Sequence, residues 1–452
     1  MRSEGDNGDT ASGELPQTLG TRDVASLVVG TVIGSGIFIV PATVAYNLGG
    51  SLTLTLLLWA VGGALSFLGA MTYAELGTMM PRAGGLYVFI REAAGPLVAF
   101  LYGWVLFLVI AAGTMAALGV AAVAYVERVI PPIPYLATIG PTVMIAGLTA
   151  VNVFSTRQSI AFTNVTTLLK VLLIVAIVAA LLEGEILVSH RAPAVPASIS
   201  PLSHLSAAGV GTAMLAVLWA YEGWQWVTFT GGELRNPRRA IPLGLLGGSA
   251  VVVVIYLLAN LAFLKALGPR ALSSSSVAAD AARMILGRTA ETVVAATIVL
   301  SIVSSANGTI LTVPRVLLAM ARDGVFFRAM GRVHPRHQTP ALAVLAVGAM
   351  ATLYALTGTF DQLLRYVVFT EWLFYGIGGI AVFILRRKWP RVSRPFRVPG
   401  YPVTPALFVG TAAAVVLNTI LTQPRLAAVG LGAVATGIPV FYAWRLRQRN
   451  GR

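Results

Sequence analysis

Two stretches of this sequence place glycine beside polar or aromatic residues inside long apolar runs. The first is residues 28–41, VVGTVIGSGIFIVP, in which Gly30, Gly34 and Gly36 flank Ser35. Glycine weakens a helix that leucine or alanine would continue. In a membrane, a broken helix is tolerated only where protein or a water-filled cavity covers its free backbone groups. Free N–H groups attract an anion and free carbonyls a cation, so this break could hold a zwitterion. The alternative is that these glycines only allow close helix packing.

The second stretch is residues 218–226, LWAYEGWQW. A carboxylate, a glycine and three tryptophans suit a lipid-facing helix poorly. They predict a second unwound point, at which Gly223 permits the break, aromatic rings close over a small solute and Glu222 lines a polar cavity. The alternative is aromatic packing around a structurally hydrogen-bonded Glu222.

Further polar residues lie within apolar runs, where charge is costly and is read by default as functional. Lys170 lies about ten residues from the cytoplasmic start of its span, too deep for easy snorkelling. Its ammonium could replace a bound cation at the first break; the alternative is a snorkelling lysine. Ser304 and Asn307 could line a pathway or pack against a neighbouring helix. Glu75 is expected to form a gate ion pair or to be a structural partner.

The composition is that of an integral membrane protein. Hydrophobic residues make up 57% of the chain and charged residues 11%, with a mean hydropathy of +0.81, against roughly 25% charged residues in soluble domains. At about 20 residues per span, we predict twelve spans. They cover residues 24–48, 52–80, 93–126, 135–154, 160–182, 207–231, 243–267, 279–320, 341–356, 363–385, 403–421 and 426–444. The third and eighth runs exceed one span, which predicts tilted helices or polar extensions.

Basic residues indicate the orientation. With the N-terminus in the cytoplasm, 23 lysines and arginines fall in inside loops and 8 in outside loops, and Lys170 lies within a span. This bias follows the positive-inside rule for twelve spans with both termini inside. We therefore expect a multi-pass protein of the cell (inner) membrane. The net charge of +15 is interpreted as topology and contact with anionic membrane lipid, with no nucleic acid partner.

The predicted organisation is a disordered cytoplasmic tail at residues 1–21, one transmembrane domain at 22–446 and a short cytoplasmic tail at 447–452. The polar start lacks the pattern of a cleaved signal peptide. The two breaks lie five spans apart, which predicts inverted repeats at about 22–184 and 205–388, with helices 11 and 12 at 401–446.

Enzyme chemistry finds little support in the sequence. The chain has no cysteine and four histidines, all in predicted loops without metal-ligand spacing. No phosphate-binding loop is present. We therefore expect no catalytic residues, no metal, no cofactor and no disulfide-linked partner.

Several motifs, in this order and spacing, give the sequence a family resemblance. They are Ile33-Gly34-Ser35-Gly36-Ile37-Phe38 with Pro41, Tyr73-Ala74-Glu75-Leu76 followed by Pro81-Arg82-Ala83-Gly84-Gly85, Trp219-Ala220-Tyr221-Glu222-Gly223-Trp224 followed by Gly232-Glu233-Leu234-Arg235-Asn236-Pro237-Arg238-Arg239, Asn307-Gly308, Glu371-Trp372-Leu373-Phe374 and Arg394-Pro395-Phe396-Arg397-Val398-Pro399. The chain resembles the amino acid–polyamine–organocation superfamily, and within it the L-type amino acid transporter family, from about residue 21 to residue 445.

The resemblance implies an all-α membrane protein with twelve helices in a LeuT-type five-plus-five inverted repeat, with helices 1 and 6 broken. It implies sodium-independent transport of L-amino acids, often by exchange. It further implies a substrate site formed at the two breaks by Ile33, Gly34, Ser35, Gly36, Trp219, Ala220 and Glu222.

Individual roles also follow from the resemblance. The substrate carboxylate lies on the N–H groups of Ser35 and Gly36, and the amino group meets carbonyls at the two breaks. Trp219 matches the aromatic residue that closes over the substrate, and Lys170 matches a lysine that occupies a sodium-like site. An acidic residue at position 222 occurs in transporters of both neutral and cationic amino acids.

The sequence is therefore interpreted as a secondary transporter that exchanges neutral L-amino acids by alternating access. The alternatives are a cationic amino acid or polyamine exchanger, a proton-coupled permease, and, outside transport, a membrane receptor or scaffold. The exact substrate, the stoichiometry and the oligomeric state are left open by the sequence.

Overall fold

The structure is a computed structural model that describes residues 14–131, 133–188, 206–268, 271, 274, 276–357 and 360–450. Within these residues the fold is helical, and its only β-pairing is two isolated bridges, Leu19 with Leu234 and Ala83 with Thr230. The helices, with the π-helical turn η1 and the 3-10 helices η2, η3 and η5, are α1 (Thr21–Val32), α2 (Gly36–Asn47), α3 (Leu52–Met79), α4 (Leu86–Ala94), α5 (Pro96–Val105), η1 (Leu106–Ala111), α6 (Ala112–Val129), α7 (Leu136–Phe154), α8 (Thr156–Val188), α9 (Ala207–Ala220), η2 (Trp224–Phe229), η3 (Gly231–Glu233), α10 (Pro237–Leu267), α11 (Val277–Leu286), α12 (Arg288–Thr312), α13 (Pro314–Arg322), η5 (Arg328–Gly331), α14 (Ala341–Thr357), α15 (Phe360–Lys388), α16 (Val403–Thr422) and α17 (Pro424–Asn450).

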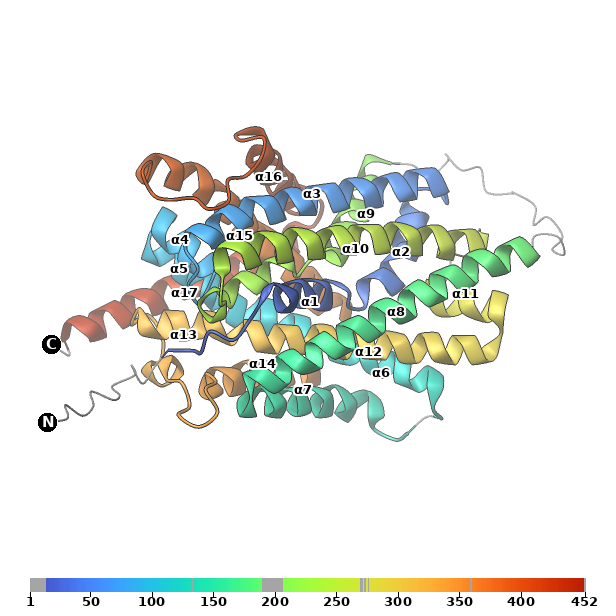
Figure 1. The fold of residues 1–452 in the computed structure, drawn as a ribbon, viewed down its shortest axis with the longest axis horizontal. Coiled ribbons are helices and arrows are strands. Elements are labelled where there is room, and N and C mark those ends of the chain that lie inside the picture. Colours follow the sequence, from blue (N-terminus) through green and yellow to red (C-terminus); the bar gives the residue numbers. More distant parts are fainter. Residues whose placement is uncertain are drawn as a thin grey trace, which may run out of the picture.

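Long apolar helices run side by side through the molecule. In the described residues nine helices are long and apolar enough to cross a membrane, and α1 with α2 would make a tenth as one span bent by 46°. α3, α8, α10 and α12 follow the long axis, and the approach to α1 and the end of α17 lie toward the same end of the bundle (Figure 1). The all-helical membrane architecture predicted from composition is confirmed.

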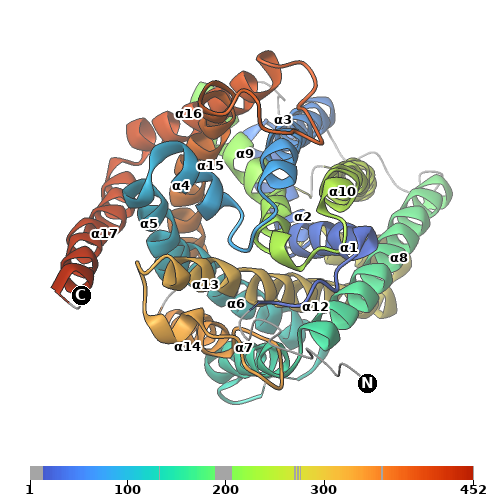
Figure 2. The same ribbon diagram turned by 60° about the vertical axis from the view of Figure 1, so that its left-hand side comes forward.

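Burial separates a central group of helices from a peripheral one. In the most apolar part of the continuous α5–η1–α6 helix, 72% of the residues are buried, and the share is the same in α12–α13. In α17 only 22% of the corresponding residues are buried. α1 packs against α8, α10 and α12 near the middle of the bundle (Figure 2). Apolar side chains that are exposed on the outer helices suit contact with lipid.

Two of the long predicted runs contain helix boundaries. The run at 93–126 crosses Gly95, which separates α4 from α5, and the run at 279–320 crosses Gly287, which separates α11 from α12. Both glycines have positive φ, 93° and 88°. Each run therefore includes the end of a short helix. The stretches that follow, Pro96–Val129 with 34 residues and Arg288–Arg322 with 35, still exceed one span, so tilt or a polar extension stays the prediction for them.

The predicted disordered tail at residues 1–21 also differs from the structure. Residues 1–13 lie outside the described part, as do 451–452 of the predicted tail at 447–452. Leu19, however, pairs with the chain after η3: its N–H donates to the Glu233 carbonyl at 3.0 Å, and the Arg235 N–H donates to the Leu19 carbonyl at 3.0 Å. The apolar side chain of Leu19 is buried, so the segment is ordered by packing that its polar composition did not indicate. At the other end, helix α17 continues to Asn450.

Candidate functional site

The first interruption separates α1 from α2 at residues 33–35. The Ile33 N–H still bonds the Val29 carbonyl, whereas the Gly34 N–H turns back to the Val32 carbonyl at 2.8 Å. The first amides of α2 have no carbonyl one turn earlier to bond, as at every helix start. The Ser35 hydroxyl is buried and has no hydrogen-bond partner in the described residues. The start of α2 therefore presents backbone N–H groups and one hydroxyl that are available to bind a ligand.

The carbonyls freed at the end of α1 are bonded by side chains from neighbouring helices. Lys170 of α8 is fully buried, and its Nζ donates to the carbonyls of Gly30 at 2.8 Å and Ile33 at 2.7 Å. The Ser301 hydroxyl of α12 also donates to the Ile33 carbonyl, at 2.8 Å, and Ser305 donates to the Thr31 carbonyl at 2.7 Å. The ammonium thus lies where a bound cation would neutralise converging carbonyl dipoles.

The second interruption lies between α9 and η2. α9 ends at Ala220, η2 begins at Trp224, and Gly223 between them has a φ of 111°, a conformation that favours glycine. The Thr31 hydroxyl donates to the Gly223 carbonyl at 3.1 Å, which ties this break to the first one.

Tyr256 of α10 also connects the two breaks by hydrogen bonds. Its hydroxyl lies 2.9 Å from the Val32 carbonyl and 3.0 Å from the Ala220 carbonyl, the last residues of α1 and α9. The sequence analysis did not select Tyr256. The one feature that marks Tyr256 in the sequence is a hydroxyl group within a long apolar run. Many buried tyrosines have this feature, so it does not identify a functional residue.

One cavity lies between the two breaks, with about 430 Å³ of space free of atoms, including space open to solvent. Of the predicted substrate residues, all except Ile33 line it. Ile33 is fully buried. Its carbonyl takes part in the site by accepting hydrogen bonds from Lys170 and Ser301. The lining residues are Thr31, Val32, Gly34, Ser35, Gly36, Thr114, Leu118, Trp219, Ala220, Glu222, Gly223, Trp226, Ser305 and Thr309.

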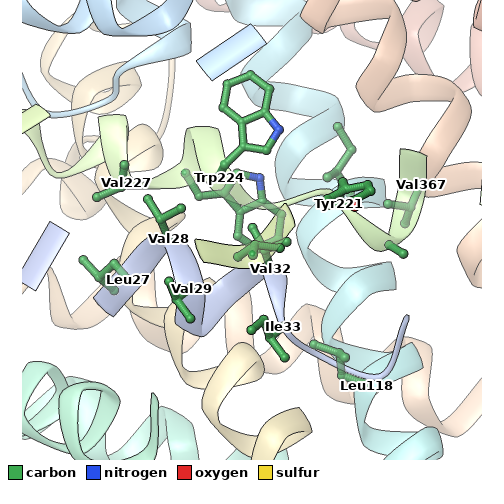
Figure 3. Packing of buried hydrophobic residues seen from close by; sticks show 14 of the residues in the cluster. Leu27, Val28, Val29, Val32, Ile33, Leu118, Tyr221, Trp224, Val227 and Val367 are labelled. Carbon is green, nitrogen blue, oxygen red and sulfur yellow. The ribbon is translucent and has the colours of Figure 1, made fainter. Parts of the chain in front are cut away.

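The two breaks approach each other closely at the cavity. A Cβ atom on Gly36 would lie 3.0 Å from the Ala220 Cα and 3.1 Å from its Cβ, so only glycine fits there without displacement. Apolar side chains pack around the two breaks: Val28 and Val32 lie near Trp224 and Tyr221, and Ile33 lies near Leu118 (Figure 3). Val32 and Leu118 belong both to this packing and to the lining of the cavity.

The predicted pathway residues lie away from the cavity. Asn307 bonds Asn152 at 2.8 Å and the hydroxyls of Ser159 and Thr163 at 3.0 and 2.9 Å. Ser304 accepts from the Thr166 hydroxyl at 3.0 Å. These bonds join α12 to α7 and α8.

Ser305 and Thr309 line the cavity in their place. Adjacent residues in a helix point about 100° apart, whereas residues four apart share a face. The polar run in α12 was therefore recognisable from the sequence, but the face that meets the cavity was not.

A separate ion-pair cluster holds Glu75 at the end of α3. Arg386 donates to both of its carboxylate oxygens, at 2.8 and 2.6 Å, and the Val398 N–H donates at 2.7 Å. Arg394 lies 3.4 Å away. These contacts attach the loop after α15 to α3, and Glu75 has no contact with the cavity.

The site offers backbone donors on one side of a small cavity and carbonyl dipoles on the other. No cluster of three or more histidine or acidic side chains suited to a metal occurs in the described residues. Such a site can hold a small molecule that carries an anionic and a cationic group close together.

Comparison with known proteins gives a consistent result. The sequence pattern of the amino acid permease family matches residues 19–443. The chain is 31% identical over 447 residues to the serine/threonine exchanger SteT of Bacillus subtilis (strain 168), covering 98% of this chain and 100% of that protein. It is 32% identical over 419 residues to the human b(0,+)-type amino acid transporter 1, covering 91% of this chain and 84% of that protein. It is also 32% identical over 440 residues to the human cystine/glutamate transporter, covering 94% and 85%.

Proposed function

The chain belongs to the amino acid permease family, and from this premise we propose that it exchanges neutral L-amino acids across the cell membrane by alternating access, without sodium. Exchange is the activity that the name of the serine/threonine exchanger SteT states, and the names of the two human relatives state transport. The observation that carries the proposal is the cavity between the two interrupted helices, which meets donors at the start of α2 and carbonyls at the end of α9.

The pose of the substrate follows from these backbone groups. The carboxylate lies on the N–H groups of Ser35 and Gly36, beside the buried Ser35 hydroxyl that has no partner in the described residues. The Ile33 carbonyl already accepts from Lys170 and Ser301. Those two bonds use both lone pairs of the Ile33 carbonyl, whereas the Ala220 carbonyl accepts from Tyr256 and keeps one lone pair. The amino group therefore binds chiefly at the end of α9, among the carbonyls of residues 219–222.

Sodium independence rests on Lys170. An ammonium that donates to the Gly30 and Ile33 carbonyls supplies the positive charge that a sodium ion would bring to the end of α1. This charge is covalently attached to α8, so it neither binds nor leaves during the cycle.

The finer architecture is also proposed. Each of the twelve predicted ranges contains helix, and α1–α2 and α9–η2 supply the two broken spans. Repeated geometry supports the inverted repeats at about 22–184 and 205–388. A short helix, one glycine with φ near 90° and a long buried helix follow one another as α4, Gly95 and the continuous α5–η1–α6 run, and again as α11, Gly287 and α12. Helices 11 and 12 are α16 and α17.

Trp219 is the proposed gate. It lines the cavity at the end of α9, and its ring lies 3.4 Å from the Cβ position of Gly36. A rotation of α9 relative to α2 therefore moves the ring across the cavity. The excess of arginine in alternate loops supports a cytoplasmic location for both termini.

Glu222 supports a second candidate, a cationic amino acid or polyamine exchanger, because its carboxylate lines the cavity. An ionised Glu222 would pair with a cationic side chain in a poorly solvated site. We favour neutral substrates because aromatic and apolar side chains surround this carboxylate.

The test is uptake of labelled alanine into proteoliposomes that are empty or preloaded with unlabelled alanine, in sodium or in choline buffer. We expect uptake only into preloaded vesicles and at equal rates in the two buffers. Equal uptake into empty vesicles would contradict exchange, and a receptor or scaffold would give no uptake. Competition by serine, leucine and arginine then distinguishes the neutral exchanger from the cationic one.

A further inference from the structure

The cavity wall is backed by a buried carboxyl group that the proposed cycle does not use. Glu371 of α15 is 1% exposed. Three donors converge on one of its oxygens, Oε1: the Gln225 amide at 2.8 Å, the Trp226 indole at 3.1 Å and the Tyr375 hydroxyl. Gln225 and Trp226 belong to η2, so this single oxygen joins the second interrupted helix to α15.

The other oxygen of Glu371 has no donor. Its Oε2 and the Gln225 Oε1 are both buried without a hydrogen-bond partner in the described residues. While Glu371 is ionised, its Oε2 is an acceptor that carries negative charge and receives no hydrogen bond from the part of the chain that the structure describes. A proton on Oε2 turns one acceptor into a donor and removes the uncompensated charge, which is costly to bury.

No cation neutralises this carboxyl group within the described residues. The titratable groups that face it are Tyr73 of α3, Tyr102 of α5, Tyr375 of its own helix and, through Tyr375, Glu222. The other elements packed on α15, namely α4, α6, η1, α16 and α17, place no charged group against it. The surroundings therefore offer neutral hydroxyls and a second acid.

A route leads from this group to the cavity. The Tyr375 hydroxyl bonds Glu371 and also lies 3.5 Å from the Glu222 Oε1. Glu222 in turn lines the cavity. A tyrosine hydroxyl carries one proton and accepts others, so it can pass a proton between two carboxyl groups.

We propose that Glu371 is a proton-binding site that fills from the substrate cavity through Glu222 and Tyr375, and that the proton is a second ligand of the transport cycle. The inference rests on the proposed function and adds a co-ligand to it. An aqueous proton binds Glu222, and Tyr375 gives its hydroxyl proton to Glu371 as it receives that of Glu222. A half-turn of the Glu371 carboxyl group then brings the new O–H to the Oε2 position. Tyrosine is regenerated, and one proton has moved.

Coupling to the substrate follows from Trp226. This residue lines the cavity and donates to Glu371. When η2 moves away from α15 during alternating access, Glu371 loses two of its three donors together. Its affinity for a proton then differs between the two states of the carrier, which is the requirement for linkage.

Infrared spectroscopy of the purified full-length protein tests proton occupancy without transport. We expect a carboxylic acid C=O band at neutral pH that disappears in Glu371→Gln and persists in the control Glu127→Gln, which removes an exposed carboxyl at the end of α6. Absence of the band from the unmutated protein, or its persistence in Glu371→Gln, would overturn the proposal.

Proteoliposomes that contain a pH-sensitive dye test coupling. With alanine on both sides of the membrane and an imposed pH gradient, we expect exchange to speed the collapse of that gradient in the unmutated protein and in Glu127→Gln. The signal should be lost in Glu371→Gln and slowed in Tyr375→Phe, which keeps both carboxyl groups. Exchange of alanine without proton movement in the unmutated protein overturns this inference alone, whereas absence of exchange at every pH overturns the proposed function. Fast arginine exchange without a proton signal would mean that the two carboxyl groups bind a cationic side chain.

Discussion

Replacing Gly36 with alanine tests the close approach of the two interrupted helices. The added Cβ would lie 3.0 Å from the Ala220 Cα, 3.1 Å from the Ala220 Cβ and 3.4 Å from the Trp219 ring. The nearest of these atoms is backbone, which cannot rotate away as a flexible side chain would. The start of α2 and the end of α9 must therefore separate by a few tenths of an ångström.

The magnitude follows from two opposing terms. Overpacking a tight site costs about 1–3 kcal/mol, and replacing glycine by alanine within a helix contributes about 0.5–1 kcal/mol of stability. We expect a net destabilisation of about 1–2 kcal/mol, a factor of roughly 5–30 in the folding equilibrium. The same displacement moves the Ser35 and Gly36 amides from the carboxylate, so KM for alanine should rise and turnover should fall. Gly36→Val should abolish transport.

Gly247→Ala is the matched control. It makes the same change in α10, at a position where a Cβ atom meets nothing within 4 Å, and we expect it to be neutral or stabilising by about 0.5–1 kcal/mol. The measurements are the melting temperature in detergent and KM and turnover in proteoliposome exchange, with monodispersity checked for each variant. A Gly36→Ala protein that matches Gly247→Ala in both stability and KM would refute the reasoning.

Three further predictions concern the charged residues. Lys170→Ala should reduce turnover far more than expression, because the Gly30 and Ile33 carbonyls lose their ammonium donor; steep sodium dependence of exchange in the unmutated protein would contradict this role. Glu222→Gln should keep the ranking of serine, alanine and leucine over arginine in competition assays, whereas arginine competition that is strong in the unmutated protein and lost in the variant would indicate a cationic exchanger. Glu75→Gln should lower stability by about 3 kcal/mol, since it leaves buried arginine charge uncompensated; an unchanged melting temperature would show that the cluster is not structural.

The sequence by itself determined the class of protein and indicated the two stretches in which the helices are interrupted. Both depend on local information: apolar runs of spanning length require helices in a membrane, and glycine weakens a helix wherever it stands. The glycine-containing stretches 28–41 and 218–226 were therefore identifiable from composition and spacing, and the interruptions at 33–35 and 221–223 lie within them. The depth of Lys170 within its span was likewise readable from the chain.

Only the tertiary structure decided which side chains meet at those interruptions. Tyr256 reaches both breaks although 36 residues separate it from Ala220 and 224 from Val32. Ser305 faces the cavity while its neighbour Ser304 faces α8, a choice made by the rotation of α12 in the bundle. Glu371 acquires two of its three donors from η2, 146 and 145 positions away in the chain. Such contacts depend on how helices pack against one another, and no local pattern of residues encodes the angle at which a helix faces a neighbour that is distant in sequence.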